Sequence, residues 1–287
     1  MFSRQRTLLS IVEAAGGRAS HLHLTKWAFA VRQETGTCGG DTFYDFLPYK
    51  YGPFSFTLYQ EATKLCREGL LAEADGDTWV LTDAGRTQAA HVGRQVATDV
   101  RSVVSQLGRL PAAELLRRTY DRYPWFTVLS EVRRKLPRPE GTVAAWTAGY
   151  EGLSVDAFLN RLIERGIRRL IDVRHHPVAR RYGFHGRTLA ALCGKLGIEY
   201  VHLPQLGIPG HLRRHLRGRE DYSALFADYE RYLDEHGDAV RRAADLTMEK
   251  PGVLVCMEAD PDRCHRSRLA RRIAGTAGLA VGDLGAG

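Results

Sequence analysis

The sequence has no apolar run long enough to cross a bilayer, which takes roughly 20 residues. The N-terminal stretch MFSRQRTLLS also lacks the apolar core and the small-residue cleavage site of a signal peptide. We therefore expect no membrane partner and a cytoplasmic location. With 287 residues, 44% of them hydrophobic, the chain is long enough for one large domain or two ordinary ones.

Cysteine is scarce, and several common catalytic motifs are missing. The five cysteines form an odd and widely scattered set, which favours reduced thiols over a disulfide framework. No GxGxxG, Walker, HExxH or GxSxG pattern occurs, which argues against nicotinamide-dependent, nucleotide-hydrolysing, zinc-protease and serine-hydrolase functions. We expect no cofactor, although a divalent metal stays open.

Negative charge is in the minority. The formal net charge is +8 at pH 7 and the isoelectric point is near 9.4. A basic chain attracts polyanions, so nucleic acid, DNA above all, is the expected partner. Many basic proteins bind no nucleic acid, and the charge alone does not decide the question.

Residues 1–90 are expected to form three helices and a hairpin. Apolar residues recur at helical spacing over 4–15, over 22–31 behind Ser20 as N-cap, and over 55–68, where Gly69 ends the helix. The β-prone runs 70–73 and 78–82 flank Asp75-Gly76-Asp77, which is a hairpin signal.

This order of elements, with REGLL at 67–71 and LTDAGR at 81–86, resembles the winged-helix family of DNA-binding domains. The resemblance implies a last helix in the major groove and a wing against the backbone or the minor groove. The phosphate contacts would be Lys50, Lys64, Arg67 and Arg86. Winged helices also serve as protein-interaction modules, and that alternative stays open.

Residues 91–141 are interpreted as a helical extension and a linker. The helical pattern runs from 86 to 108, and two further helices are expected over 112–120 and 125–136, with Tyr123-Pro124 breaking between them. The segment 135–141 has the proline and charge content of a linker, so we place the domain boundary there.

Strands and helices alternate over residues 142–287. The β-prone runs 143–148, 169–174, 199–204 and 252–255, and a short fifth run at 279–281, are separated by helical patterns. This alternation predicts an α/β fold, a mostly parallel, Rossmann-like three-layer sheet domain. Parallel strands deliver their carboxyl ends to one edge, so the polar residues there should converge on one crevice. They are Tyr150, Glu151, Asp172, Arg174, His202, Cys256 and Glu258.

Four motifs in this half resemble the signatures of the DUF488 family, bacterial and archaeal proteins of unsettled function. They are GYEG at 149–152, DVRHHPVARRYGF at 172–184, YVHLPQLG at 200–207 and CMEADPDRCHRSRLA at 256–270. The resemblance implies an α/β domain with a polar site but supplies no reaction. The chemistry must therefore come from the residue types.

Arginines and acids dominate the predicted crevice. Arg174, Arg180, Arg181 and Arg266 suit a phosphate or carboxylate ligand, and Phe184 could stack on an unpaired base. Glu151, Asp172 and Glu258 could activate water, stabilise a sugar cation, or hold a divalent metal. Asp172 could instead be a structural partner of Arg174.

Two cysteines and a histidine add a second kind of chemistry. Cys256, or Cys264 at a helix start, could be a nucleophile with His265 or His202 as base, or the thiols could simply pack or contact substrate. Cys256, Cys264 and His265 could also ligate zinc, but this spacing fits no standard zinc module and no fourth ligand is evident. We therefore assign no metal ligand from the sequence.

The leading hypothesis is a DNA-binding enzyme that hydrolyses a bond at a base or nucleotide, such as a glycosylase-like repair enzyme that removes a modified base. The alternative is a winged-helix transcriptional regulator whose α/β domain senses an anion, a metal or an oxidant. A weaker third hypothesis has the first half binding protein.

Overall fold

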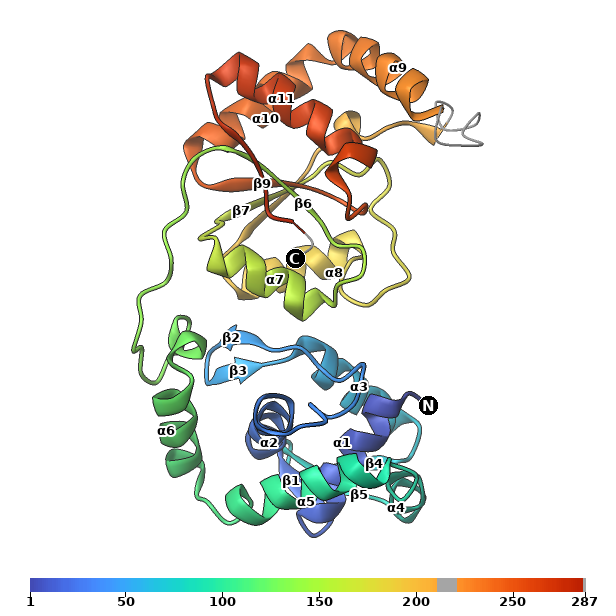
Figure 1. Cartoon of the computed structure of the whole chain (residues 1–287), viewed down its shortest axis with the longest axis vertical. Helices are drawn as coiled ribbons and strands as arrows, with labels where there is room; N and C mark the ends of the chain where they lie inside the picture. Colours follow the sequence, from blue (N-terminus) through green and yellow to red (C-terminus); the bar gives the residue numbers. More distant parts are fainter. Residues whose placement is uncertain (211–220, 286–287) are drawn as a thin grey trace. The chain divides into compact units, whose positions relative to one another are not determined.

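The computed structural model of the chain describes residues 1–210 and 221–285. It divides into two compact units, Met1–Pro137 and Arg138–Gly287 (Figure 1). Among the helices of the described residues, none combines the length and the apolar character needed to cross a membrane.

The first unit contains three helices followed by a hairpin, as the sequence predicts. Its elements are α1 (Ser3–Ala14), β1 (Arg18–Ser20), α2 (His21–Glu34), β2 (Leu47–Tyr49), β3 (Gly52–Phe54), α3 (Phe56–Arg67), β4 (Leu71–Ala74) and β5 (Thr78–Leu81). Ser20 caps α2 and Ser55 caps α3, each hydroxyl accepting a backbone N–H at 3.2 Å. Gly69 ends α3 with a φ of +70°, a conformation that glycine adopts without strain.

Two pairings in the first unit were not expected from the sequence. β1 pairs antiparallel with β5, which gives a three-stranded sheet in the order β1-β5-β4. The aromatic run before α3 folds as a second hairpin, β2 with β3.

The helical extension packs into the same core. The pattern predicted as one helix over 86–108 forms two, α4 (Asp83–Ala89) and α5 (Arg94–Leu107), and α6 (Ala112–Arg122) follows. Val100, Val103 and Val104 of α5 and Leu115 of α6 are buried with the apolar faces of α1, α2 and α3.

The helix predicted over 125–136 is wrong. Only Pro124–Thr127 form a short 3-10 turn, η1, and no helix follows. The Ser130 hydroxyl accepts the backbone N–H groups of Val132 and Arg133 at 3.2 and 3.3 Å, and Thr127 accepts that of Lys135 at 2.9 Å. Such local side-chain bonds replace the bonds a helix would make.

The second unit is built on a parallel five-stranded sheet, as predicted. Its strands are β6 (Ala145–Gly149), β7 (Arg169–Asp172), β8 (Glu199–His202), β9 (Gly252–Cys256) and β10 (Val281–Asp283). They lie in the order β10-β6-β9-β7-β8, and every neighbouring pair is parallel.

Helices cover both faces of this sheet (Figure 1). α7 (Val155–Glu164) and α8 (Gly186–Lys195) lie on one face, and α9 (Asp221–Glu235), α10 (Gly237–Glu249) and α11 (His265–Ala277) lie on the other. Apolar residues of α9, α10 and α11 pack with Ile171, Leu254 and Ala145 of the strands. The described part of the unit is therefore an α/β/α arrangement of three layers.

The register brings the polar strand ends together. Asp172 at the end of β7 lies beside His202 of β8 and Val255 of β9, and Gly149 of β6 lies beside Cys256. Residues that lie far apart along the sequence therefore meet at one edge of the sheet.

Candidate functional site

A pocket of about 240 Å³ opens at the carboxyl ends of β6, β7 and β9. Its wall includes Tyr150, Arg174, His175, His176, Cys256 and Glu258. This is the edge at which parallel α/β sheets commonly bind ligands. His175 and His176 were not assigned a role from the sequence, although their position directly after a strand-end motif could have indicated one.

Asp172 and Arg174 form a buried ion pair. Asp172 is fully buried and Arg174 is 6% exposed. The Arg174 Nε donates to Asp172 Oδ1 at 2.8 Å, a second bond joins Nη2 to Oδ2, and the Tyr200 hydroxyl donates to Oδ2 at 2.7 Å. Burial opposes the charge on Arg174, but the bonds and charge of Asp172 outweigh it and raise the pKa of the guanidinium.

This network makes Asp172 a structural partner of Arg174, which was the alternative interpretation of that residue. The other Arg174 nitrogen, Nη1, donates to the Tyr150 hydroxyl at 2.8 Å and to the Phe184 carbonyl at 2.7 Å. Removing either charge would leave the other buried without a partner, which would lower the free energy of unfolding by about 3–5 kcal/mol.

Phe184 is fully buried and does not reach the pocket surface. Its ring stacks on Tyr150 with centroids 4.1 Å apart and planes 11° apart. The ring therefore holds Tyr150 in place and is not available to stack on a base in this arrangement.

The four predicted anion-binding arginines lie in three different environments. Arg174 lines the pocket. Arg180 and Arg181 are exposed on the loop after β7, where Arg181 donates to the Leu153 carbonyl. Arg266 is fully buried; its guanidinium donates to the carbonyl of Glu258 and, at 3.1 Å, to that of Ala259. Arg266 thus fixes the backbone of the loop after β9.

The same loop is held from the β6 side. The Glu151 carboxylate accepts the Ala259 N–H at 3.0 Å. A Cβ added to Gly149 would lie 1.8 Å from the Glu258 carbonyl oxygen, so only glycine allows this approach. The neighbouring loop, which follows β7, is held from the β8 side, where His202 Nε2 donates to the Arg174 carbonyl at 2.8 Å. Glu151 therefore positions the backbone after β9, and His202 positions the backbone after β7.

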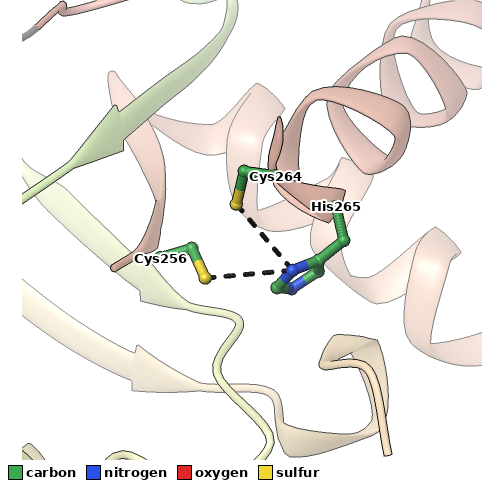
Figure 2. A group of neighbouring side chains, drawn as sticks. All are labelled: Cys256, Cys264 and His265. Carbon is green, nitrogen blue, oxygen red and sulfur yellow. Dashed lines mark hydrogen bonds between the residues drawn. The ribbon is translucent and has the colours of Figure 1, made fainter. Parts of the chain in front are cut away.

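Cys256, which lines the pocket, lies close to Cys264 and His265 (Figure 2). Cys256 ends β9, Cys264 is the N-cap of α11, and His265 is the first residue of that helix. Both sulfurs lie 3.8 Å from His265 Nδ1. All three residues are buried.

Glu258 completes this group. Its Oε2 accepts the Cys256 thiol at 2.9 Å and the Cys264 thiol at 3.1 Å. Burial would raise the pKa of Glu258, but the two thiol hydrogen bonds outweigh burial and lower it. The side chain of Glu258 is therefore an ionised carboxylate at neutral pH.

The two thiols differ in acidity. Burial would raise the pKa of Cys264, but hydrogen bonds with Cys256 and His265 outweigh it and lower the value to about 6. The pKa of Cys256 is raised well above its usual value, first by its hydrogen bond with Cys264 and then by burial. Cys264, at a helix N-terminus, is the thiol that ionises more readily.

The predicted DNA-contacting cations all lie on the surface of the first unit. Lys50 pairs with Glu131 at 3.0 Å, Lys64 with Glu68 at 3.6 Å, and Arg86 with Glu13 at 2.6 Å. Arg67 is exposed in the last turn of α3. Exposed ion pairs of this kind are weak and exchange readily for other partners.

Residues 154–273 match the family model described as domain of unknown function DUF488. The predicted resemblance to DUF488 is therefore confirmed over these residues, which run from the start of α7 into α11 and leave the GYEG motif outside the match. No curated protein and no solved structure matches the chain.

Proposed function

We propose that the protein is a DNA-binding hydrolase. The first unit binds the duplex as a winged helix, and the pocket of the second unit hydrolyses a bond at a base or nucleotide, removal of a modified base being the concrete reaction. The observation that carries this proposal is the position of the Glu258 carboxyl in the wall of a polar pocket beside Arg174, His175 and His176.

The element order of the first unit supports the DNA-binding half. Helix α1, strand β1, helices α2 and α3, and the β4–β5 hairpin follow one another, and β1 joins the hairpin as a third strand. This order is typical of winged-helix domains, in which the last helix enters the major groove. Thr63, Lys64 and Arg67 form an exposed polar side of α3 that suits such a contact.

The pocket offers the groups that hydrolysis needs. Glu258 can take a proton from water while the hydroxyl adds to the carbon of the scissile bond, and the proton then passes to the departing base. His175 Nδ1 donates to the Pro204 carbonyl at 3.1 Å, so the neutral ring presents Nε2 as a proton acceptor. Arg174 adds a guanidinium to the pocket wall, although its charge is balanced by its buried partner Asp172.

The proposal is tested with Glu258→Gln. We expect turnover of duplexes that carry modified bases to fall by about 10²–10⁴-fold, since a positioned acid–base group contributes that much. DNA affinity should not change, because Glu258 lies in the second unit. Abasic sites and strand breaks in labelled duplexes measure turnover, and a binding assay on the same duplexes measures affinity.

Glu164→Gln is the matched control, because it neutralises an exposed carboxylate on α7 outside the pocket. Full turnover by Glu258→Gln would remove Glu258 from the mechanism. Failure of the wild-type protein to cleave any modified duplex, with and without added metal, would reject the hydrolase proposal.

A second function is favoured by the thiol, imidazole and carboxylate group at the pocket. In that case the protein is a winged-helix regulator, and a metal or an oxidant at the group changes its DNA affinity. A change of affinity on adding metal or oxidant, without bond cleavage, would select this function over the first.

A further inference from the structure

Three donor atoms, one of them from the pocket-lining Cys256, have the spacing that a metal ion requires. The sulfurs of Cys256 and Cys264 and the Nδ1 of His265 all lie within 4.8 Å of one another. Tetrahedral zinc, with Zn–S near 2.3 Å and Zn–N near 2.0 Å, places a sulfur and a nitrogen about 3.6 Å apart. Both observed sulfur to nitrogen distances are 3.8 Å.

The histidine is already oriented as a ligand. His265 Nε2 donates to the Val173 carbonyl at 3.2 Å, so the neutral ring keeps its lone pair on Nδ1, which faces both sulfurs (Figure 2). Histidines that bind metals commonly donate their other ring N–H in this way, which fixes tautomer and ring angle. The Tyr229 ring packs edge-on against the imidazole at 5.3 Å.

Both thiols face the same carboxylate in the interior. Both donate to one oxygen of Glu258, and both belong to residues that are at most 3% exposed. Two buried thiolates without a counter-charge are costly. A divalent cation would compensate both charges at once.

We propose that Cys256, Cys264 and His265 bind one divalent ion of the zinc class through two sulfurs and Nδ1. Thiolate and imidazole donors together select zinc over magnesium or calcium, which take oxygen ligands. Each binding event releases two thiol protons. The sequence already offered these three residues as possible zinc ligands, but their spacing fits no standard zinc module, and only the folded loop shows that their donor atoms lie together.

The fourth position of the ion belongs to water and faces the pocket on the side of Glu258. Three protein ligands and one water are the usual arrangement of catalytic zinc, and the ion lowers the pKa of that water to near 7. Cys256 and Glu258 both line the pocket, so this side of the group is the one that substrate can approach. Glu258, released from the thiols, becomes the hydrogen-bond partner of the water.

This use of the ion rests on the proposed hydrolase, whereas the binding of the ion does not. In the reaction, Glu258 accepts one proton from the bound water, and the hydroxide forms a bond to the electrophilic atom. The bond to the leaving group breaks, and Glu258 returns the proton to it. Water is the only co-reactant.

The test is zinc binding by the full-length chain. After treatment with a chelator, the protein is titrated with Zn²⁺ in competition with a chromophoric chelator, and with Co²⁺ as an optical probe of thiolate ligation. We expect about one ion per chain and a thiolate-to-cobalt charge-transfer band. Cys256→Ser, Cys264→Ser and His265→Ala should each weaken zinc binding by more than about tenfold.

Two kinds of control accompany these variants. Cys66→Ser and His91→Ala remove a thiol and an imidazole from the first unit and should keep wild-type affinity. Glu258→Gln should also keep the ion, because Glu258 contacts the water, while losing turnover. The charge-transfer band of the wild-type chain does not depend on whether any variant folds.

Each result decides one proposal. Absence of zinc binding and of the charge-transfer band in the wild-type chain overturns the metal site. Loss of the ion in Glu258→Gln overturns the open fourth position, because Glu258 would then be a ligand. Zinc binding without cleavage of any duplex rejects the hydrolase and leaves the site, whereas cleavage that persists after complete removal of metal rejects the catalytic ion and leaves the hydrolase.

Discussion

Lys26 is a buried amine that bonds to a backbone carbonyl. It is 3% exposed, and its Nζ donates to the Pro53 carbonyl at 2.8 Å. Burial lowers its pKa from 10.5 to about 7. Lysine in the unfolded chain keeps its ordinary pKa, so between pH 7 and about 10 the unfolded state binds more protons than the folded state. The destabilising contribution of Lys26 to the free energy of unfolding therefore becomes smaller as pH rises through that window.

We predict that Lys26→Met stabilises the first unit more at pH 7 than at pH 10. The difference should be about 3 kcal/mol, because a shift of one pKa unit corresponds to about 1.4 kcal/mol and some of the effect remains at pH 10. Denaturant unfolding of both proteins at each pH measures it. Lys64→Met, at an exposed position on α3, should show no such pH dependence. An equal effect of Lys26→Met at both pH values would contradict the lowered pKa.

Single residues differ in how far the sequence revealed their roles. Glu258 and Arg174 could be placed at the pocket because each lies at or just beyond the carboxyl end of a β-prone run. The burial of Phe184 and Arg266 could not, since their neighbours come from segments that the fold brings together. Likewise, the hydrogen bonds from two thiols to Glu258 depend on the conformation of the turn that follows β9. That conformation could not be predicted, because the turn has no repeating pattern of apolar residues.

Helix α3 is the element on which DNA binding depends in our proposal. Its N-cap, C-terminus and buried stripe follow from Ser55, Gly69 and the apolar spacing. Its exposed side carries Lys64 and Arg67, while the hairpin beside it carries the acidic residues Glu73, Asp75 and Asp77. Phosphate contact should therefore come from the helix more than from the tip of the hairpin.

We predict that Lys64→Ala and Arg67→Ala each weaken DNA binding by a similar factor on all sequences. Because each variant removes one cation from the phosphate backbone, the slope of log K against log salt should also fall by about one. Fluorescence anisotropy at several salt concentrations measures both quantities. Arg94→Ala, at an exposed arginine on α5, is the control. Unchanged salt slopes in both α3 variants would separate this helix from DNA binding.

Element type could be predicted where one periodicity persists, and less well elsewhere. All five strands of the second unit and the helical stretches between them were expected, because apolar runs and amphipathic stretches alternate there, although the one stretch expected over 222–248 forms two helices, α9 and α10. The stretch 125–136 carries helical spacing too, but the hydroxyls of Thr127 and Ser130 capture the backbone. Periodicity also does not predict which strands pair, as the antiparallel pairing of β1 with β5 shows.

At the scale of the whole molecule, each unit has its own apolar core. One core joins the helices of the first unit, and another lies between the sheet of the second unit and α9, α10 and α11. The chain between η1 and β6 has no regular structure and is largely exposed. Each unit should therefore unfold separately.

We predict two unfolding transitions in the intact chain. Trypsin should cut first at Arg133, Arg134 or Lys135, and both transitions should survive the cut. Zinc should raise only the transition of the second unit, by about 2.7 kcal/mol at a concentration one hundred times its dissociation constant. Calorimetry before and after cleavage measures this. A single transition that zinc shifts as a whole would show that the units unfold together.

The place of β9 in the sheet has a consequence for biosynthesis. This strand is the fourth of its unit to leave the ribosome, yet it lies between β6 and β7 and joins them. Until residues 252–256 emerge, β6 has no neighbour, and β7 pairs with β8 alone. The strand that joins β6 to β7 also carries Cys256, the first of the two thiols of the site. The sheet of a nascent chain therefore cannot assemble before Cys256 has been synthesised.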